Sequence, residues 1–551
     1  MQRGRSWFGC VPMSTAALPV ERDFDLPAVK PSWPSSASDG GFAKGSIDLG
    51  GMEVRQVTTF AKVWSTTQGG QDGLGATFFK PAPVPAGFHA LGHYAQPNNR
   101  PLFGHVLVAR DASGTGALLA PPLDYALVWS SGQDDGAGFF WLPTPPDGYK
   151  AVGVAVTATK DKPQPGEVMC VRADFTDACE AEESVWGSDK DGFSATGLRP
   201  AVRGIDARGV HTGTFLARSN AAPTSASALA CLKNNSAAYT SCMPDLPQLN
   251  AVLAAYSPHV YLHPSDPYLP SSVTWFFENG ALLYQKGNPT PTPVAADGSN
   301  LPQGGGNDDA YWLDLPADAG QKERVKKGDL AGAKAYVQAK PMLGGTATDL
   351  ALFFFYPFNG PARAKVGPLT IPLGMIGEHV GDWEHLTLRV SNFSGELLRM
   401  YFSQHSTGAW ADASQLEYLD GRPVAYASRH GHAFYPREGM VLQGDSKLGV
   451  GIRNDCAKGS RLDTGGGRCE LVSAEYLGAA GKVAEPAWLG FERGWGPREE
   501  YDIGREINRA ARILPRAIKE RLAQLVNKLL VGEGPTGPKM KGSWRNDERD
   551  P

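Results

Sequence analysis

One short run of the sequence combines carboxylates and imidazoles closely enough to do chemistry. It reads Gly-Glu-His-Val-Gly-Asp-Trp-Glu-His and spans residues 377–385. If this run and the apolar residues after it form a strand, Asp382 and Glu384 share a face with the apolar side chains that follow at two-residue spacing, because alternate residues of a strand point the same way. That face is expected to be buried, so two neighbouring carboxylates are expected to point toward the interior.

A buried pair of carboxylates needs compensation, because an unpaired buried charge is costly and like charges repel. A raised pKa, an Arg or Lys partner, or a bound cation would each relieve the pair. His379 lies just upstream and would complete a cation site. Oxygen ligands with one imidazole and waters suit Mg²⁺, Ca²⁺ or Mn²⁺ better than structural Zn²⁺. We therefore identify His379, Asp382 and Glu384 as candidate ligands of a divalent cation.

Further polar residues near this run form a possible additional site, namely Glu378, His385, His405, His430 and His432. His430 and His432 are two residues apart and would share a strand face. Four interpretations stay open: a cation with a binding role, a metal-dependent or acid–base hydrolase with His405 or His430 as base, a salt-bridged structural network, or unrelated exposed residues. The sequence contains no GxSxG, P-loop or HExxH motif, so the common nucleophile, NTPase and zincin signatures are missing.

Composition and charge narrow the functional classes. Of 551 residues, 42% are apolar and 20% charged, which excludes global disorder. The 66 Gly and 43 Pro favour turns and short strands over long helices. A net charge of −4 gives no global positive field for nucleic acid. Without an apolar run long enough for a transmembrane helix, or the apolar segment of a signal peptide, we expect a cytoplasmic chain that meets endomembranes or the vacuole only peripherally.

An internal repeat is visible between residues 45 and 220. Val63-Trp64-Ser65 recurs as Val128-Trp129-Ser130, and a third Val-Trp pair occurs at 185–186. Each copy has a Gly-aromatic-x-x-x-Gly motif, at 87, 148 and 192, and ends in a strand-like run, at 106–111, 168–174 and 214–219. Small sheets of this kind bury their aromatic faces only by stacking on one another. We predict a β-prism-like unit with threefold pseudosymmetry, with an ordinary β-sandwich as the alternative.

The rest of the chain is predicted to be mostly β as well. Residues 221–257 have the composition of a connector, and residues 1–44 are expected to be irregular. From 258 to 500, short apolar runs with period-two patterning alternate with Gly, Pro, Asn and Asp, which predicts an antiparallel β-sandwich. The predicted architecture is therefore a β-prism-like repeat, a β-sandwich and a short C-terminal helix.

A basic amphipathic helix is predicted in the segment 501–551. Apolar residues from 518 to 530 follow Pro515 at helical spacing and form one stripe. Such a helix can lie on anionic lipid, with Arg516, Lys519, Arg521 and Lys528 facing the membrane. Packing of its stripe on the sandwich is the alternative. The final residues, from 534 onward, are expected to be irregular and mobile.

Long segments of the chain resemble the plant vacuolar protein sorting-associated protein 62 family, whose biochemical activity is poorly defined. The matching segments run from about residue 45 to 540 and include GATFFKPAPVPAGFHALGHYAQPNNRPLFG, GFFWLPTPPDGYKAVG, YLPSSVTWFFENGALLY and GEHVGDWEH. The family name implies a role in vacuolar sorting. The Trp-containing repeat is also similar to a segment of the large vacuolar-protein-sorting lipid-transfer proteins, which implies an adaptor or membrane-contact module.

The stretch 350–435 is similar, more distantly, to the necrosis- and ethylene-inducing toxin proteins. Their heptapeptide Gly-His-Arg-His-Asp-Trp-Glu supplies metal ligands from its first His, its Asp and its Glu, which correspond here to His379, Asp382 and Glu384. The match is partial, because three heptapeptide positions differ and the toxins' upstream Asp has no counterpart in this sequence. Those toxins dock on sphingolipid head groups through a β-sandwich, so the resemblance implies a sandwich with a cation-tuned surface.

Together these patterns predict a peripheral protein that recognises lipid or glycan head groups in endomembrane or vacuolar trafficking, with a divalent cation in the sandwich. Two alternatives stay open. One is a metal-dependent hydrolase of a phosphoryl or glycosyl head group, and the other is a protein-interaction adaptor without a ligand. The expected partners are membrane lipid head groups or glycans and not nucleic acid, and a non-enzymatic role is favoured.

Overall fold

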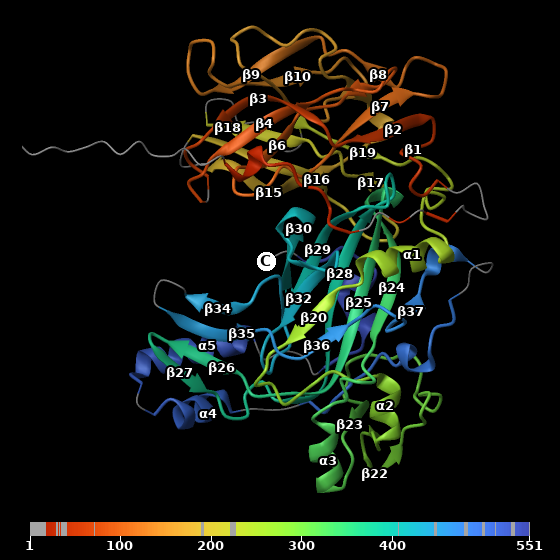
Figure 1. Ribbon diagram of the computed structural model, residues 1–551, viewed down its shortest axis with the longest axis vertical. Coiled ribbons are helices and arrows are strands. Elements are labelled where there is room, and N and C mark those ends of the chain that lie inside the picture. The colour runs from red at the N-terminus through yellow and green to blue at the C-terminus, as the bar shows by residue number, and fades with distance from the viewer. Residues whose placement is uncertain are drawn as a thin grey trace, which may run out of the picture.

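The chain forms two β-rich units that follow the order of the sequence, as Figure 1 shows for the computed structural model. The structure describes residues 18–549 apart from 29–30, 32, 35–40, 71, 189–191, 221–227, 406, 446–448, 479–482, 499–501, 513 and 530–534. Most of the predicted irregular segment 1–44 therefore lies outside the described residues. Within it the structure has one short 3₁₀ turn, at Pro19–Glu21.

The N-terminal unit consists of six small sheets, which form two sets of three. The sheets of the first set are built alike from three strands each: β3 (Phe60–Thr66), β4 (Ala76–Pro81) and β6 (Tyr94–Pro97); β9 (Asp124–Ser130), β10 (Phe139–Thr144) and β12 (Ala155–Thr157); β15 (Cys179–Ser188), β16 (Phe193–Pro200) and β18 (Phe215–Ser219). The second set comprises β1 (Ser46–Asp48), β2 (Met52–Val57), β7 (Val106–Asp111) and β5 (His89–Ala90); β11 (Tyr149–Lys150), β13 (Cys170–Arg172) and β8 (Leu119–Ala120); β14 (Thr176–Asp177), β19 (Cys231–Lys233) and β17 (Gly209–Val210).

The three repeated tryptophans meet in the middle of the first set. The ring centroids of Trp64 and Trp186 are 5.7 Å apart, those of Trp129 and Trp186 are 5.6 Å apart, and those of Trp64 and Trp129 are 6.5 Å apart, all edge to face. Aromatic pairs favour this arrangement over face-to-face stacking. A Cβ at position 138 would lie 2.4 Å from the Trp64 ring, so only glycine fits there. The repeated Val-Trp motif therefore marks one core position in each of three sheets.

In the third copy of the repeat, Gly192 does not occupy the position equivalent to Gly87 and Gly148 that the sequence motif predicts. Gly87 and Gly148 precede the short strands β5 and β11, whereas Gly192 precedes the central strand β16. The element equivalent to β5 and β11 is β17, which begins at Gly209. Likewise, the run 214–219 forms β18, which occupies the place of β6 and β12, and not that of β7. The offset arose because the Gly-aromatic pair is a generic turn signal that recurs at non-equivalent turns.

Two sheets of the C-terminal unit face each other across one apolar core. The larger has six strands in the order β30 (Thr407–Asp412), β29 (Leu397–Gln404), β28 (His379–Ser391), β25 (Ala347–Asn359), β24 (Ala335–Met342) and β37 (Cys469–Ser473). The smaller contains β31 (Tyr418–Leu419), β32 (Arg422–Ala427), β20 (His259–Leu262) and β36 (Arg461–Asp463), with β33 (Phe434–Tyr435) paired to β32. The pairs β20–β32 and β24–β37 are parallel, so these sheets are mixed and not purely antiparallel.

The predicted connector contains a helix that belongs to this core. α1 (Leu246–Tyr256) begins with a capping box, in which the Asp245 side chain accepts from the Gln248 backbone N–H. Its residues Leu249, Val252 and Leu253 pack in the core between the two sheets. The segment therefore closes the edge of the C-terminal unit.

Two smaller lobes extend from the C-terminal unit (Figure 1). One contains β21 (Leu282–Gln285), β22 (Asn288–Pro293), β23 (Tyr311–Asp314), α2 (Val273–Glu278) and α3 (Ala319–Val325). The other, which we call the helical lobe, contains β26 (Arg363–Val366), β27 (Leu369–Pro372), β34 (Gly439–Asp445), β35 (Val450–Cys456), α4 (Ile503–Ala510) and α5 (Arg516–Leu529). The predicted mostly β class is confirmed. No helix in the described ranges is long and apolar enough to span a membrane.

Candidate functional site

Strand β28 carries the predicted run and lies between β25 and β29 in the larger sheet. Asp382 and Glu384 lie on the face that continues into the core through Leu386, and their exposed fractions are 8% and 7%. Tyr356 and Phe354 are their cross-strand partners on β25. The two carboxylates therefore point inward, at the end of the core, as the period-two pattern predicts.

His432 is the partner of the first carboxylate. Its Nδ1 is 2.9 Å from Asp382 Oδ2, and its Nε2 is 3.2 Å from the Tyr268 carbonyl oxygen. The His432 ring also stacks on Tyr356, with centroids 3.8 Å apart. Burial alone would raise the pKa of Asp382, but the His432 hydrogen bond and the nearby imidazoles outweigh burial and lower it.

Glu384 has much weaker compensation. The Ser403 hydroxyl donates a hydrogen bond to it, and no ion pair joins it to any described Lys, Arg or His. Burial, and then the neighbouring Asp382 carboxylate, raise the pKa of Glu384 to about 8, and the charge of Lys541 and the Ser403 hydroxyl offset them only in part. The Tyr356 hydroxyl close by is fully buried and has no hydrogen-bond partner among the described residues. The site therefore holds one carboxylate that is hydrogen-bonded to an imidazole beside one that has no ion-pair partner among the described residues.

His379 begins β28 and points one ring nitrogen back at its own strand. Its Nδ1 donates to the Gly381 carbonyl at 2.9 Å. The ring lies close enough to Asp382 to help lower the pKa of that carboxyl. Glu378 precedes it in a half-buried turn. In the described part of the chain, however, no three His, Cys, Asp or Glu side chains come close enough to one point to hold a metal ion.

Three of the other candidate histidines lie in turns and have left-handed backbone. The φ values of His405, His430 and His432 are +59°, +72° and +52°. The prediction that His430 and His432 share a strand face is therefore wrong. They lie in the turn before β33, and the His430 ring donates to the Pro361 carbonyl at 2.9 Å. A left-handed residue other than Gly is uncommon and costs roughly 1 kcal/mol, so the surrounding contacts must hold this turn in place.

His405 lies beside the turn that carries His430 and His432. Its ring lies against the turn at Gly431, and its Nε2 is 3.2 Å from Asn454 Oδ1. Burial lowers the pKa of His405, so its ring is neutral near pH 7. The turn thus places His432 against Asp382. His405 packs beside this turn, and the His430 ring faces the Pro361 carbonyl instead of the carboxylates. Whether His405 or His430 acts as a base stays a prediction.

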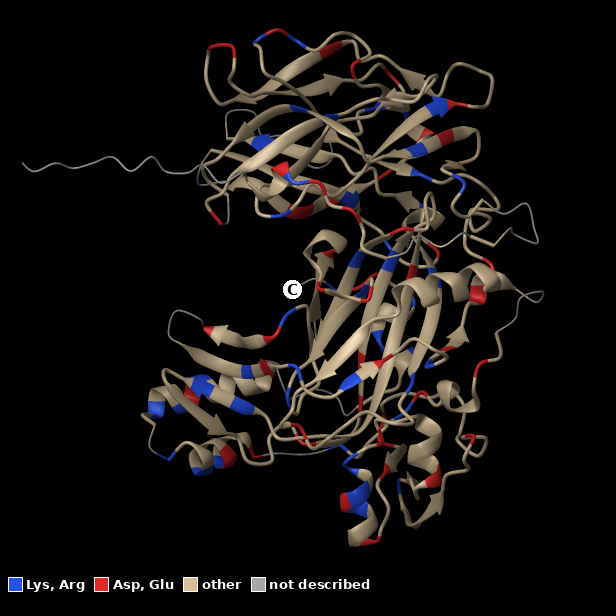
Figure 2. Cartoon of the chain, in the orientation of Figure 1, with Lys and Arg blue, Asp and Glu red and all other residues tan. Residues whose placement is uncertain are grey.

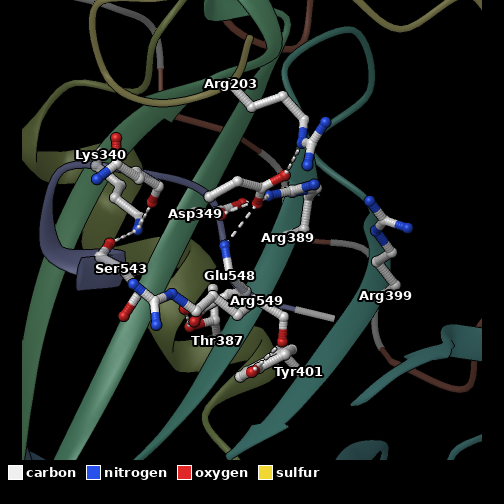
Figure 3. Close-up of polar contacts among 12 residues, drawn as sticks. Arg203, Lys340, Asp349, Thr387, Arg389, Arg399, Tyr401, Ser543, Glu548 and Arg549 are labelled. Atoms are coloured by element: carbon white, nitrogen blue, oxygen red, sulfur yellow. Dashed lines mark hydrogen bonds and ion pairs between the residues drawn. The ribbon is translucent and has the colours of Figure 1, made fainter. Parts of the chain in front are cut away.

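His385 lies on the opposite face of β28, because neighbouring residues of a strand alternate. That face is covered by residues 535–549, which we call the C-terminal strap. His385 Nε2 is 3.0 Å from Glu548 Oε2, and the Thr387 hydroxyl donates to Glu548 Oε1 at 2.6 Å (Figure 3). His385 therefore holds the strap and does not join the Asp382–Glu384 site.

The strap is anchored by a buried network of charges. Arg389 donates to both Asp349 oxygens at 2.7 Å and to Asp547 Oδ1 at 2.5 Å. The other oxygen of Asp547 accepts from Arg203 of the N-terminal unit at 2.8 Å. Figure 3 shows Arg203 and Arg389 converging there, and the ammonium of Lys340 reaching the carbonyl of Ser543. The structure thus differs from the predicted mobile tail, because residues far apart in sequence supply partners for its acids.

The predicted amphipathic helix is α5, and its stripe is buried in the helical lobe. Leu522 and Val526 are fully buried against β26, β27 and β35. The Arg516 side chain is 92% exposed, and Arg521 pairs with Asp445 of β34. Lys519 is half-buried, and the side chain of Lys528 lies outside the described residues. Of the two alternatives, packing against the sheet therefore accounts for the apolar stripe.

Sequence reasoning missed several residues that complete the Asp382–Glu384 site. Asp266, Tyr268, Tyr356, Ser403 and Asn454 approach it from four separate segments, since the first two share one loop. Asp266 lies 3.8 Å from His432 and accepts from the His430 backbone N–H at 2.6 Å. No spacing in the sequence connects these residues to β28.

Comparison with known proteins bears on the whole chain. Residues 20–548 match the sequence model of a family described as vacuolar protein sorting-associated protein 62. A curated relative of that name from Saccharomyces cerevisiae is 24% identical over 226 residues, which cover 37% of this chain and 42% of the relative. The chain thus matches less than half the length of that relative.

Two solved structures align with parts of the fold. GNIP1Aa from Chromobacterium piscinae aligns with a TM-score of 0.28 at 19% identity, over 37% of this chain and 40% of its own. Necrosis and Ethylene inducing Protein 2 from the causal agent of cocoa's Witches Broom disease aligns with a TM-score of 0.17 at 14% identity, over 40% of this chain and 82% of its own.

Proposed function

This chain belongs to the vacuolar protein sorting-associated protein 62 family, and from that premise we propose that it is a peripheral, non-catalytic protein of vacuolar sorting that recognises lipid or glycan head groups. The Asp382–Glu384 site is the proposed recognition site, with a divalent cation between the protein and the head group. The family predicted from the sequence is therefore confirmed. A plant origin remains an expectation.

The observation that carries this proposal is the uncompensated carboxylate of Glu384. It is 7% exposed, adjacent to a second buried carboxylate, and hydrogen-bonded by a neutral hydroxyl. A buried ionised carboxylate without a positive partner is strongly disfavoured, so the group stays protonated or gains a cation. A divalent cation would remove both the burial cost and the repulsion from Asp382.

The ligand types at this site suit a hard cation, although the described side chains do not converge fully on one point. Asp382 and Glu384 would supply oxygen ligands, and His379 would supply a nitrogen ligand. A metal-bound histidine usually donates its other N–H to a carbonyl, as His379 does to Gly381. In the described part of the chain, no three potential ligand side chains converge on one point. A Mg²⁺, Ca²⁺ or Mn²⁺ ion that keeps several bound waters therefore fits better than an ion coordinated by protein ligands alone. Those waters would be the positions that head-group oxygens replace.

The helical lobe supports a peripheral encounter with anionic membranes. Its outward side chains include the exposed Arg505, Arg509 and Arg512 as well as Arg516, and Figure 2 shows basic residues on both of its helices. Met375, which is 55% exposed, follows Gly374, and Gly374 lies against Glu506 of α4. Basic side chains beside an exposed apolar one favour the surface of an anionic bilayer.

Metal analysis and vesicle flotation would test this proposal. Purified wild-type chain, loaded with Ca²⁺, Mg²⁺ or Mn²⁺ and desalted, is expected to retain roughly one ion per chain, and Glu384→Gln less than about one tenth of that. Vesicles that contain sphingolipid or phosphoinositide are expected to float the wild type in the presence of the ion and to lose it with EDTA. Glu438→Gln, at an exposed position, is the matched control.

Two outcomes would overturn the proposal. One is a wild-type chain that retains none of the three ions. The other is an unchanged metal content in Glu384→Gln, which would place any bound ion elsewhere. Flotation that is insensitive to both EDTA and Glu384→Gln would separate membrane binding from this site and leave the helical lobe as its source.

A further inference from the structure

A cavity of about 390 Å³ lies where the two units meet. Its walls come from the N-terminal segment at Asp25, from β6 and the turn after it, from β15, and from β29 and β30 of the larger sheet. It is separate from the Asp382–Glu384 site, whose residues do not line it. The volume falls in the range of small-molecule sites.

Two ion pairs cross this cavity between the units. Arg100 Nη2 is 2.9 Å from Asp412 Oδ2, and Arg399 Nη1 is 3.0 Å from Glu182 Oε1. A third arginine of the wall, Arg389, is held by the acids described above and appears beside Arg399 in Figure 3. Each guanidinium therefore already has a carboxylate, and the wall offers no unpaired cation among the described residues.

The wall does contain carboxylates without partners. Glu183, next to Glu182 on β15, makes no hydrogen bond or ion pair with any residue in the described ranges, and its side chain is exposed to the cavity. The same holds for Asp25. Burial, the Asp412 carboxylate and Glu182 raise the pKa of Glu183, and Arg100 only partly offsets them. The cavity consequently has an excess of negative charge.

The remaining polar wall is neutral. Burial, and then the neighbouring His211, whose ring centroid is 6.0 Å away, lower the pKa of His105 to about 3. The His105 ring makes no hydrogen bond to a described side chain or backbone group, so it offers one donor and one acceptor to the cavity. Tyr94, Phe103 and Phe215 add aromatic and apolar surface.

We propose that this cavity binds a small organic molecule that carries at least one protonated amine. Glu183 is its anionic partner, His105 hydrogen-bonds its polar groups, and the aromatic side chains cover its carbon skeleton. An anionic ligand would meet Glu183 without a free arginine to offset it, which is unfavourable at these distances. A bare metal ion would leave most of the volume and the apolar wall unused.

Binding at this position would also join the two units. Arg100 and Glu183 belong to the N-terminal unit, whereas Arg399 and Asp412 belong to the C-terminal unit. A ligand that binds only when both walls are in place stabilises their contact by mass action. The bound amine is therefore expected to raise the temperature at which the units separate.

Calorimetric titration of the full chain would test this inference. The probes are spermidine and glucosamine as amines, N-acetylglucosamine and glucose as neutral analogues, and inorganic phosphate as an anion. We expect at least one amine to bind with a millimolar or lower dissociation constant and to raise the melting temperature. We expect Glu183→Gln to weaken that binding at least tenfold.

The matched control is Glu438→Gln, an exposed acid outside the cavity. His105→Gln provides a second variant and is expected to weaken amine binding severalfold. The inference is wrong if neither amine binds at 10 mM, if a neutral analogue or phosphate binds as tightly as the amines, or if Glu183→Gln leaves amine affinity unchanged. None of these outcomes depends on a cation at Glu384.

Discussion

Replacing Glu384 by Gln should make the folded chain more stable above neutral pH. Glu384 titrates at about 8 in the fold, against an ordinary value of 4.5. The folded state therefore binds one more proton than the unfolded state between these values, so stability is full below pH 4.5 and falls as the pH rises through 8. The shift corresponds to a loss of about 5 kcal/mol at most across this window. Gln mimics the protonated acid and removes the loss.

Thermal unfolding between pH 5 and pH 9, in EDTA, measures this effect. At pH 5 the two proteins should melt within a degree of each other, and at pH 9 Glu384→Gln should melt higher by roughly 5–10 °C. A saturating divalent cation should restore only the wild type. Glu548→Gln serves as a control because it should lower the stability of the chain instead of raising it. Glu548 contacts the opposite face of β28. Its carboxyl pKa is about 2, because His385 and other partners outweigh burial, so its removal should destabilise the chain at both pH 5 and pH 9. Parallel profiles for wild type and Glu384→Gln would refute the reasoning.

Three further predictions concern the packing that positions the site. Asp547→Asn breaks the buried charge bridge between Arg389 and Arg203, and denaturant unfolding should show a loss of about 3–5 kcal/mol; a loss below about 1 kcal/mol would show that the strap is not anchored there. Leu522→Ala should cost about 2–5 kcal/mol and speed hydrogen exchange in α5 and β35, whereas the exposed Arg516→Ala should change neither. Trp129→Ala should cost about 3–5 kcal/mol and reduce near-ultraviolet circular dichroism, and unchanged spectra would contradict the three-tryptophan core.

Much of the local structure followed from patterns that the sequence displays directly. The alternation in β28 placed Asp382 and Glu384 on a buried face, because the side-chain period of a strand depends on the backbone alone. The stripe of α5 predicted its buried side, through Leu522 and Val526. The Val-Trp repeat predicted a shared core. The generic Gly-aromatic motif failed at Gly192, because many unrelated turns need glycine.

The partners of those residues were decided only by the tertiary structure. His432 reaches Asp382 across 50 residues, and Glu548 reaches His385 across 163. His385 and Glu384 are neighbours in sequence, yet they belong to different networks on opposite faces of one sheet. Nothing in the composition of residues 534–551 distinguished an anchored strap from a mobile tail, because the cations that hold its acids are supplied by distant strands.

The sequence by itself therefore determined which side chains turn inward, through periods that are properties of single elements. The tertiary structure decided which inward charges are neutralised. Asp382 meets an imidazole, Asp547 meets two guanidinium groups, and Glu384 meets only a hydroxyl. The physical reason is that the ionisation of a buried group depends on the positions of charges within a few ångströms, and those positions are set by loops and by strand order, which local periodicity does not encode.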